Sequence, residues 1–119
     1  MLEGSFYTIH AAQTEGNTLT GEVRFDANHK IFEGHFPHQP VVPGVCMMQL
    51  IKEQFNKVQG QTYQLREGQN LKFMAMIDPQ RTPAVQLNLS WQPAEEGFWV
   101  TATLQQEGTT FLKYKARFA

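Results

Sequence analysis

The chain has 119 residues, 41% of them hydrophobic, and a formal net charge of −1 at pH 7. This length and apolar content predict one folded domain over residues 1–119 and exclude a wholly disordered chain. The balanced charge argues against a nucleic-acid-binding protein, and no apolar run is long enough for a membrane span. The single cysteine, Cys46, excludes an internal disulfide, and without a visible secretory signal we expect a cytoplasmic protein.

The first part of the chain has the pattern of a β-hairpin. Residues 7–12 place Tyr7 and Ile9 on one face, and residues 19–25 alternate apolar and polar side chains. The segment 15–17 between them, Glu-Gly-Asn, is typical of a turn. Alternation with one polar face is typical of antiparallel strands.

A long loop and a helix follow. Residues 26–42 contain glycine and prolines that disfavour regular structure, and the spacing of apolar residues predicts a helix from near Gly44 to Gly60. The first half of this helix is apolar nearly all round, so we expect it to be buried on most sides. Polar residues, including Glu53, gather in its second half and predict a solvated face there.

Four more strands are predicted, over residues 70–77, 83–91, 98–104 and 110–118. The first of these is apolar on one face and partly apolar on the other, which suits a strand covered on both sides. Short loops join the last three, so they should be antiparallel neighbours. A curved sheet of about six strands can wrap one apolar helix, and two such sheets can pair edge to edge in a dimer.

The loop before the helix carries the chemical signal. It holds His35 in a turn stiffened by glycine and proline and then leads into a helix N-terminus at Gly44. Imidazole exchanges protons near neutral pH, and the free N–H groups at a helix N-terminus stabilise an oxyanion. A base beside an oxyanion site is the apparatus for removing a proton α to a carbonyl.

These residues resemble a known family. Phe-Glu-Gly-His-Phe-Pro at 32–37, followed by Pro-Val-Val-Pro-Gly-Val at 40–45, resembles the 3-hydroxyacyl-[acyl-carrier-protein] dehydratases, the FabZ- and FabA-like enzymes of fatty-acid synthesis. Asn28 matches an asparagine that precedes the family's motif, and residues 72–79 look like a later Lys-Phe…Pro strand of the family. The resemblance implies an α+β hotdog fold, in which a curved antiparallel sheet of about five to six strands wraps one long central helix.

The resemblance also implies catalytic roles. His35 corresponds to the base that acts at C2 of the substrate, and the backbone N–H of Gly44 corresponds to the group that polarises the thioester carbonyl. The family has an acidic residue for the departing 3-hydroxyl, supplied across a dimer interface, and this chain has Gln49 at that position. An amide cannot deliver a proton at pH 7. Three possibilities stay open: His35 performs both proton transfers, another group helps, or the chain is catalytically weak.

Other residues of this region have simpler expectations. Gln49 can also be the start of the solvated helix face. We expect His29 and His38 to be surface residues, and the spacing of the histidines fits no standard metal site. No cofactor is expected, because the substrate of the family carries its own phosphopantetheine arm. Substrate contacts are expected from the apolar residues around the loop and the helix start, namely Phe32, Phe36, Pro37, Val45 and Met48.

The sequence therefore predicts a homodimeric hydro-lyase that converts (3R)-hydroxyacyl thioesters, carried by acyl-carrier protein or CoA, to trans-2-enoyl thioesters in fatty-acid or related lipid or polyketide synthesis. Two alternatives remain. One is a degenerate dehydratase that binds acyl thioesters or forms the silent half of a heterodimer with an active paralogue, and Gln49 motivates it. The other is a hotdog thioesterase, because fold alone does not determine chemistry.

Overall fold

The computed structural model describes residues 1–33 and 40–119, and contains one long helix and six strands. Strands β1 (Tyr7–Glu15) and β2 (Thr18–Phe25) come first, followed by the 3-10 helix η1 (Lys30–Phe32) and helix α1 (Gly44–Gln59). Strands β3 (Leu65–Phe73), β4 (Ala84–Pro93), β5 (Phe98–Gln106) and β6 (Thr109–Phe118) complete the chain. All paired strands are antiparallel, and the sheet order is β1-β2-β4-β5-β6-β3.

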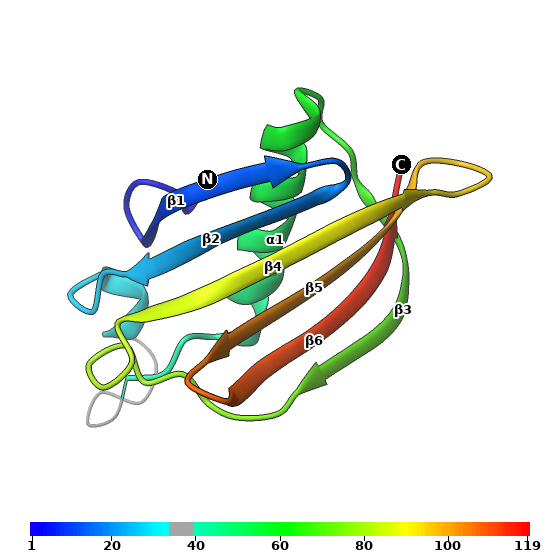
Figure 1. Cartoon of the computed structure of the whole chain (residues 1–119). Helices are drawn as coiled ribbons and strands as arrows, with labels where there is room; N and C mark the ends of the chain where they lie inside the picture. The colour runs from blue at the N-terminus through cyan, green and yellow to red at the C-terminus, as the bar shows by residue number, and fades with distance from the viewer. Residues whose placement is uncertain (34–39) are drawn as a thin grey trace.

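The sheet curves around α1, as the sequence predicts (Figure 1). The core lies between the helix and the concave face of the sheet, where Leu50, Ile51 and Phe55 of α1 have no exposed surface. The Phe55 ring packs against an aromatic cluster whose centroids lie 5.5–6.0 Å away, formed by Tyr63, Trp91, Phe98 and Phe118. This arrangement confirms the hotdog fold, in which the sheet buries most of a single apolar helix.

Both ends of α1 lie where the sequence predicts them. Pro43 precedes the first turn in an extended conformation, and Gly60 ends the helix in the left-handed region, where glycine has no steric penalty. The prediction that the first half is buried on most sides is wrong in one respect, because Val45 is 74% exposed. The buried stripe runs instead through Met47, Leu50 and Ile51.

The prediction of a solvated polar face on α1 is also wrong for Glu53, which is 7% exposed. The neighbouring Gln54 is buried too, at 2% exposed. The N-terminal segment before β1 covers them, and the N–H groups of Leu2 and Glu3 both donate to the Glu53 carboxylate. These partners lie about 50 positions away in the sequence, so helical periodicity does not detect them.

The strand predicted over residues 70–77 begins and ends earlier, as β3 (Leu65–Phe73), and lies at one edge of the sheet. All nine of its residues are exposed in the chain, so the expectation of cover on both sides is not met. Pairing with β6 forms the strand even though its first half, Leu-Arg-Glu-Gly-Gln-Asn, has no alternating pattern. Ile77, which lies beyond the strand, is buried, and its carbonyl accepts from Val42 N–H ahead of α1.

Candidate functional site

The predicted base lies outside the described residues. His35, Phe36 and Pro37 belong to residues 34–39, as does His38, so the structure does not test their roles. The two sides of this segment are described: η1 ends at Phe32, and Pro40 leads to the start of α1. The site is therefore built from the helix start and the elements that face it.

The N-terminus of α1 has the features expected of an oxyanion site. No side chain caps it, and the Gly44 and Val45 N–H groups have no hydrogen-bond partner among residues 1–33 and 40–119. The first such bonds are the Cys46 and Met47 N–H groups donating to the Pro43 carbonyl at 3.0 and 3.2 Å. The positive end of the helix dipole thus presents two free donors to an anion.

Gly44 makes a close contact with the side chain at the end of β3. A Cβ atom built there would lie 2.6 Å from Cζ of the Phe73 ring and 2.9 Å from a second ring atom. The end of β3 therefore lies directly against the first turn of α1. In the sequence, the start of α1 and the end of β3 are connected only by the family resemblance, which includes Phe73 in a later strand of the family.

A pocket opens beside this turn, between α1 and the β3–β6 side of the sheet. We call it the helix-edge pocket; it has a volume of 260 Å³. Its wall is mostly apolar with a few polar groups, as is typical of ligand sites. The lining residues are Val45, Met48, Gln49, Lys52, Leu65, Tyr114 and Phe118.

Three predicted residues meet in this pocket, and a fourth does not. Val45, Met48 and Gln49 line it together, whereas Phe32 is buried in the core, with its ring stacked on Phe6 at 5.2 Å. Phe32 also borders a separate hollow beside His29, so its contact with a substrate stays a prediction. His29 is not a plain surface residue, because its Nδ1 accepts from the Ile31 N–H and caps η1.

Tyr114 is a pocket residue that the sequence analysis missed. It is 4% exposed, and burial raises the pKa of its phenol. The hydroxyl is thus a neutral donor at the wall of the pocket. Alternation in the last strand places Tyr114 on the inner face of the sheet. A side chain with a hydroxyl group at such an inward-facing position is the sequence signal that could have identified this residue.

Gln49 does not begin a solvated face. Its side chain is half-buried, and its Nε2 donates to Glu53 Oε2 at 2.9 Å, one helical turn further on. Burial acts to raise the pKa of Glu53, but hydrogen bonds from four donors outweigh this and lower the pKa. The Glu53 carboxylate is therefore ionised at neutral pH and receives one donor from Gln49.

Within residues 1–33 and 40–119, no three His, Cys, Asp or Glu side chains are grouped closely enough to hold a metal ion. Cys46 is buried, and this burial raises the pKa of its thiol, which disfavours the nucleophilic thiolate. No helix in the described part of the chain is long and apolar enough to span a membrane.

A model of the ApeI-like family, described as ApeI dehydratase, matches residues 11–113. The chain belongs to the ApeI-like dehydratase family. This family assignment confirms the resemblance to hotdog dehydratases inferred from the loop and covers both the helix and most of the sheet.

Curated relatives support the same assignment. A 3-hydroxyacyl-[acyl-carrier-protein] dehydratase FabZ of Haemophilus influenzae is 30% identical over 93 residues, which are 74% of this chain and 62% of that protein. The FabZ of Teredinibacter turnerae is 41% identical over 39 residues, 33% of this chain and 27% of that protein. The chain thus spans less than two thirds of the length of these relatives.

Two solved structures share the fold. The chain superposes on a chain of the dehydratase heterocomplex ApeI:P from Xenorhabdus doucetiae with a TM-score of 0.78, 18% identity, and coverage of 95% of this chain and 97% of that one. An uncharacterised protein from Erwinia carotovora subsp. atroseptica gives a TM-score of 0.67 at 22% identity, with 94% and 92% coverage. At these identities the similarity supports the hotdog fold alone.

Proposed function

We propose that this chain is a hydro-lyase that removes water from (3R)-hydroxyacyl thioesters to give trans-2-enoyl thioesters. The single observation that carries the proposal is the uncapped N-terminus of α1 at Gly44, which lies beside the helix-edge pocket. The chain belongs to a dehydratase family, which gives this arrangement its chemical meaning. Gln49 lies five residues further along the same helix, about 7.5 Å at the rise of an α-helix. That spacing suits a group that contacts C3 while the helix N-terminus holds the thioester oxygen.

In the proposed reaction His35 takes the proton from C2. The electrons of the C2–H bond form the C2=C3 double bond, and the C3–O bond breaks with its electron pair on oxygen. The N–H groups of Gly44 and Val45 stabilise the negative charge that develops on the thioester oxygen. The departing hydroxide takes the proton held by the His35 imidazolium and leaves as water, so one residue serves as base and then as acid.

Gln49 has a different role from the acid of the family in this scheme. Its amide cannot supply the proton, but it can hold the 3-hydroxyl by a hydrogen bond. General acid assistance contributes about 10²–10⁴ in rate, so we expect slower turnover than in relatives that carry the acid. The apolar wall formed by Val45 and Met48 is proposed to contact the acyl chain.

We further propose that two copies pair through the β3 edge. No strand pairs with the outer side of β3 in the described part of the chain, and an unpaired edge is a template for another strand. Large apolar side chains are exposed along this side of the molecule, which supports an interface. They are Val45, Leu65, Leu71, Phe73, Met74 and Met76.

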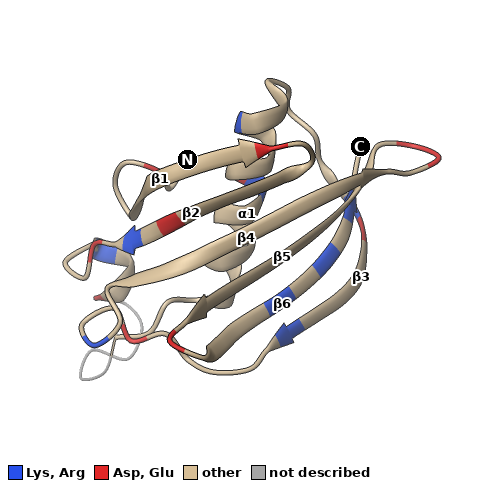
Figure 2. Cartoon of the chain, viewed as in Figure 1, with Lys and Arg blue, Asp and Glu red and all other residues tan. Residues whose placement is uncertain are grey.

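A basic stripe on the outer face of the sheet supports a carrier-protein substrate. Lys113, Lys115 and Arg117 alternate along β6, and Lys72 of β3 lies opposite Lys113 (Figure 2). Acyl-carrier proteins are acidic, so this stripe has the complementary charge to steer them. Replacing Lys113 and Lys115 with glutamate is expected to weaken turnover of carrier-linked substrates and to leave turnover of a short pantetheine thioester unchanged.

A second candidate function is supported by Gln49 in the position of the acid. The chain would then be the weakly active or silent half of a heterodimer that binds acyl thioesters. The description of the Xenorhabdus doucetiae structure as a heterocomplex supports such an assembly. Addition of a candidate partner chain should then raise activity far above the sum of the two.

One assay tests these proposals together. Purified protein is incubated with a short trans-2-enoyl thioester, and hydration is followed as the loss of conjugated-enoyl absorbance. The dehydratase proposal expects hydration that is lost in the His35→Ala variant, and it fails if the wild type is inactive alone and with a partner. Release of free thiol instead would favour a hotdog thioesterase.

A further inference from the structure

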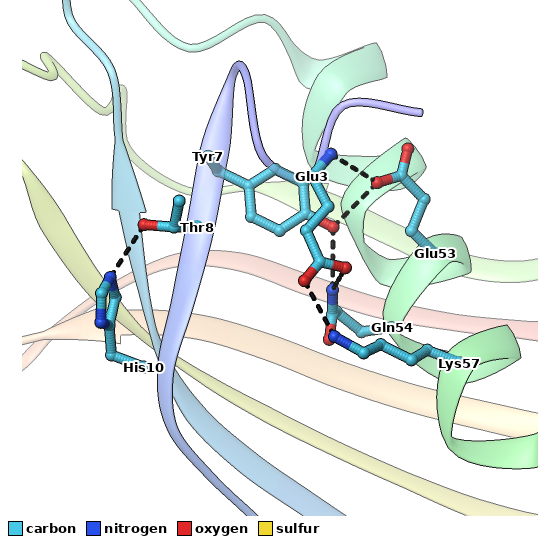
Figure 3. Close-up of polar contacts among 7 residues, drawn as sticks. All are labelled: Glu3, Tyr7, Thr8, His10, Glu53, Gln54 and Lys57. Carbon is cyan, nitrogen blue, oxygen red and sulfur yellow. Dashed lines mark hydrogen bonds and ion pairs between the residues drawn. The ribbon is translucent and has the colours of Figure 1, made fainter.

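A buried polar network connects the N-terminal segment to α1 next to Gln49. Figure 3 shows its core: Tyr7 Oη donates to Glu53 Oε1 at 2.9 Å and accepts from Gln54 Nε2 at 3.0 Å. Gln54 Nε2 also donates to Glu3 Oε1, and Lys57 Nζ contacts Glu3 Oε2, each at 2.9 Å. Burying an ionised carboxylate in this way is costly unless its oxygens are fully bonded.

The Glu53 carboxylate meets that requirement. Its Oε2 accepts from the Leu2 N–H at 2.7 Å and from Gln49 Nε2 at 2.9 Å. Its Oε1 accepts from the Glu3 N–H and from the Tyr7 hydroxyl, both at 2.9 Å. Four donors therefore occupy the four lone-pair sites of an ionised carboxylate.

This network fixes the orientation of the Gln49 amide. A carboxylate only accepts hydrogen bonds, so the end of the amide that faces Glu53 must be Nε2. Oε1 of Gln49 then points away from Glu53 and has no hydrogen-bond partner among residues 1–33 and 40–119. Gln49 lines the helix-edge pocket, so a carbonyl acceptor with no partner among the described residues lies on a side chain of its wall.

Glu53 is not itself placed to act as the acid. Its oxygens are occupied by donors, its pKa is lowered, and it does not line the helix-edge pocket. Among the described residues, Gln49 is the side chain of that pocket with which Glu53 forms a hydrogen bond. A role that acts through another side chain is a positioning role.

We propose that Glu53 is a positioning residue for the dehydration, which holds the Gln49 amide so that Oε1 accepts a hydrogen bond from the 3-hydroxyl of the substrate. The proposal rests on the proposed function. An amide that is free to rotate would present donor and acceptor alternately, whereas one bonded to Glu53 presents the acceptor alone. Small errors in the position of such a group cost about tenfold or more in rate.

A double-mutant cycle on kcat tests the proposal with the variants E53Q, Q49A and E53Q/Q49A. Because Glu53 acts through Gln49, E53Q should lower kcat about tenfold in the wild-type background and have little effect on kcat in the Q49A background. A merely structural role for Glu53 would lower kcat by the same factor in both backgrounds, and that result would overturn the proposal. The matched control is E3Q, which removes a carboxylate of the same network that does not touch Gln49; we expect a lower Tm and a kcat within about twofold of wild type.

A second measurement does not depend on activity. The side-chain amide signals of Gln49, assigned by their loss in Q49A, are recorded by ¹⁵N–¹H NMR in the wild type, E53Q and E3Q. The Nε2 proton bonded to Glu53 should exchange about tenfold faster in E53Q and be unchanged in E3Q. Unchanged signals in E53Q would overturn the positioning role, whereas absent hydration by the wild type with the expected signals would overturn only the proposed function.

Discussion

Replacing Gln49 with glutamate places a second carboxyl group against Glu53. Nε2 of Gln49 now lies 2.9 Å from Glu53 Oε2, so the new carboxyl oxygen would occupy nearly the same place. Two charges about 4 Å apart at an effective dielectric constant of about 20 repel by about 4 kcal/mol, or about three pKa units. Lys52 lines the same pocket, and its charge reduces this repulsion. We therefore expect the pair to share one proton and to lose it at a higher pH than Glu53 does in the wild type.

That shared proton should change both activity and stability. While the pair holds its proton it can supply it to the leaving hydroxyl, so Q49E should raise kcat by about 10²-fold, within the range of general acid catalysis. Activity should then fall as the pH rises through the apparent pKa. Repulsion raises the pKa of the pair in the folded state above that of a free glutamate, so stability is present at acid pH and is lost as the pH rises through the apparent pKa of the pair.

The enoyl-hydration assay from pH 5 to 9 and urea unfolding at pH 5 and 8 measure both effects. The matched control is Q49E/E53Q, which exchanges the two side chains and keeps one carboxylate bonded to one amide. Its alkaline limb should lie about two to three pH units lower than that of Q49E, and its stability should depend less on pH. Coinciding pH profiles for the two variants would refute the contact between positions 49 and 53 on which this reasoning depends.

Three further predictions concern stability and assembly. E53Q should destabilise the chain by about 2–4 kcal/mol at pH 7, because buried donors lose their charged acceptor. The difference should shrink at acid pH, where the Glu53 carboxylate of the wild type, whose pKa is lowered, becomes protonated. An equal loss of stability at pH 3 and pH 7 in urea unfolding would contradict this. G44A should lower the free energy of unfolding by about 1–3 kcal/mol, because the new methyl group meets the Phe73 ring. The same substitution in an F73A background should lower it by less. Equal losses in the two backgrounds, measured by thermal unfolding, would exclude the clash. L71K should remove about 1.5–3 kcal/mol of apolar burial energy from each of the two copies in a symmetric dimer and so weaken the dimer about 10²–10⁴-fold. An unchanged sedimentation coefficient at low micromolar concentration would rule out the β3 interface.

The local pattern of the sequence was sufficient for most of the fold. Alternation predicted β2 and β4 to within two residues at each end, and the Pro43-Gly44 and Gly60 signals predicted both ends of α1. These features depend on neighbours within a few residues, which the sequence shows directly. The edge strand β3 was misplaced because pairing with β6, rather than its own pattern, forms its first half.

Part of the candidate site could likewise be predicted from local sequence, and part could not. The residues of the loop and the helix start pointed to His35 and Gly44, and the resemblance to the dehydratases added Gln49; all three lie in one continuous segment of the chain. Whether Gln49 was a solvated side chain or a pocket residue could not be decided from α1 alone. The pattern of α1 likewise predicts Glu53 on the solvated face, because its buried partners lie in another part of the chain.

The sequence by itself thus determined most of the secondary structure, the family and the positions of the candidate catalytic groups, because these follow from patterns that are local in the chain. Only the tertiary structure decided which polar side chains are buried. The donors that make Glu53 an ionised, buried carboxylate come from Leu2, Glu3 and Tyr7, 46–51 positions away, and folding alone brings them against α1.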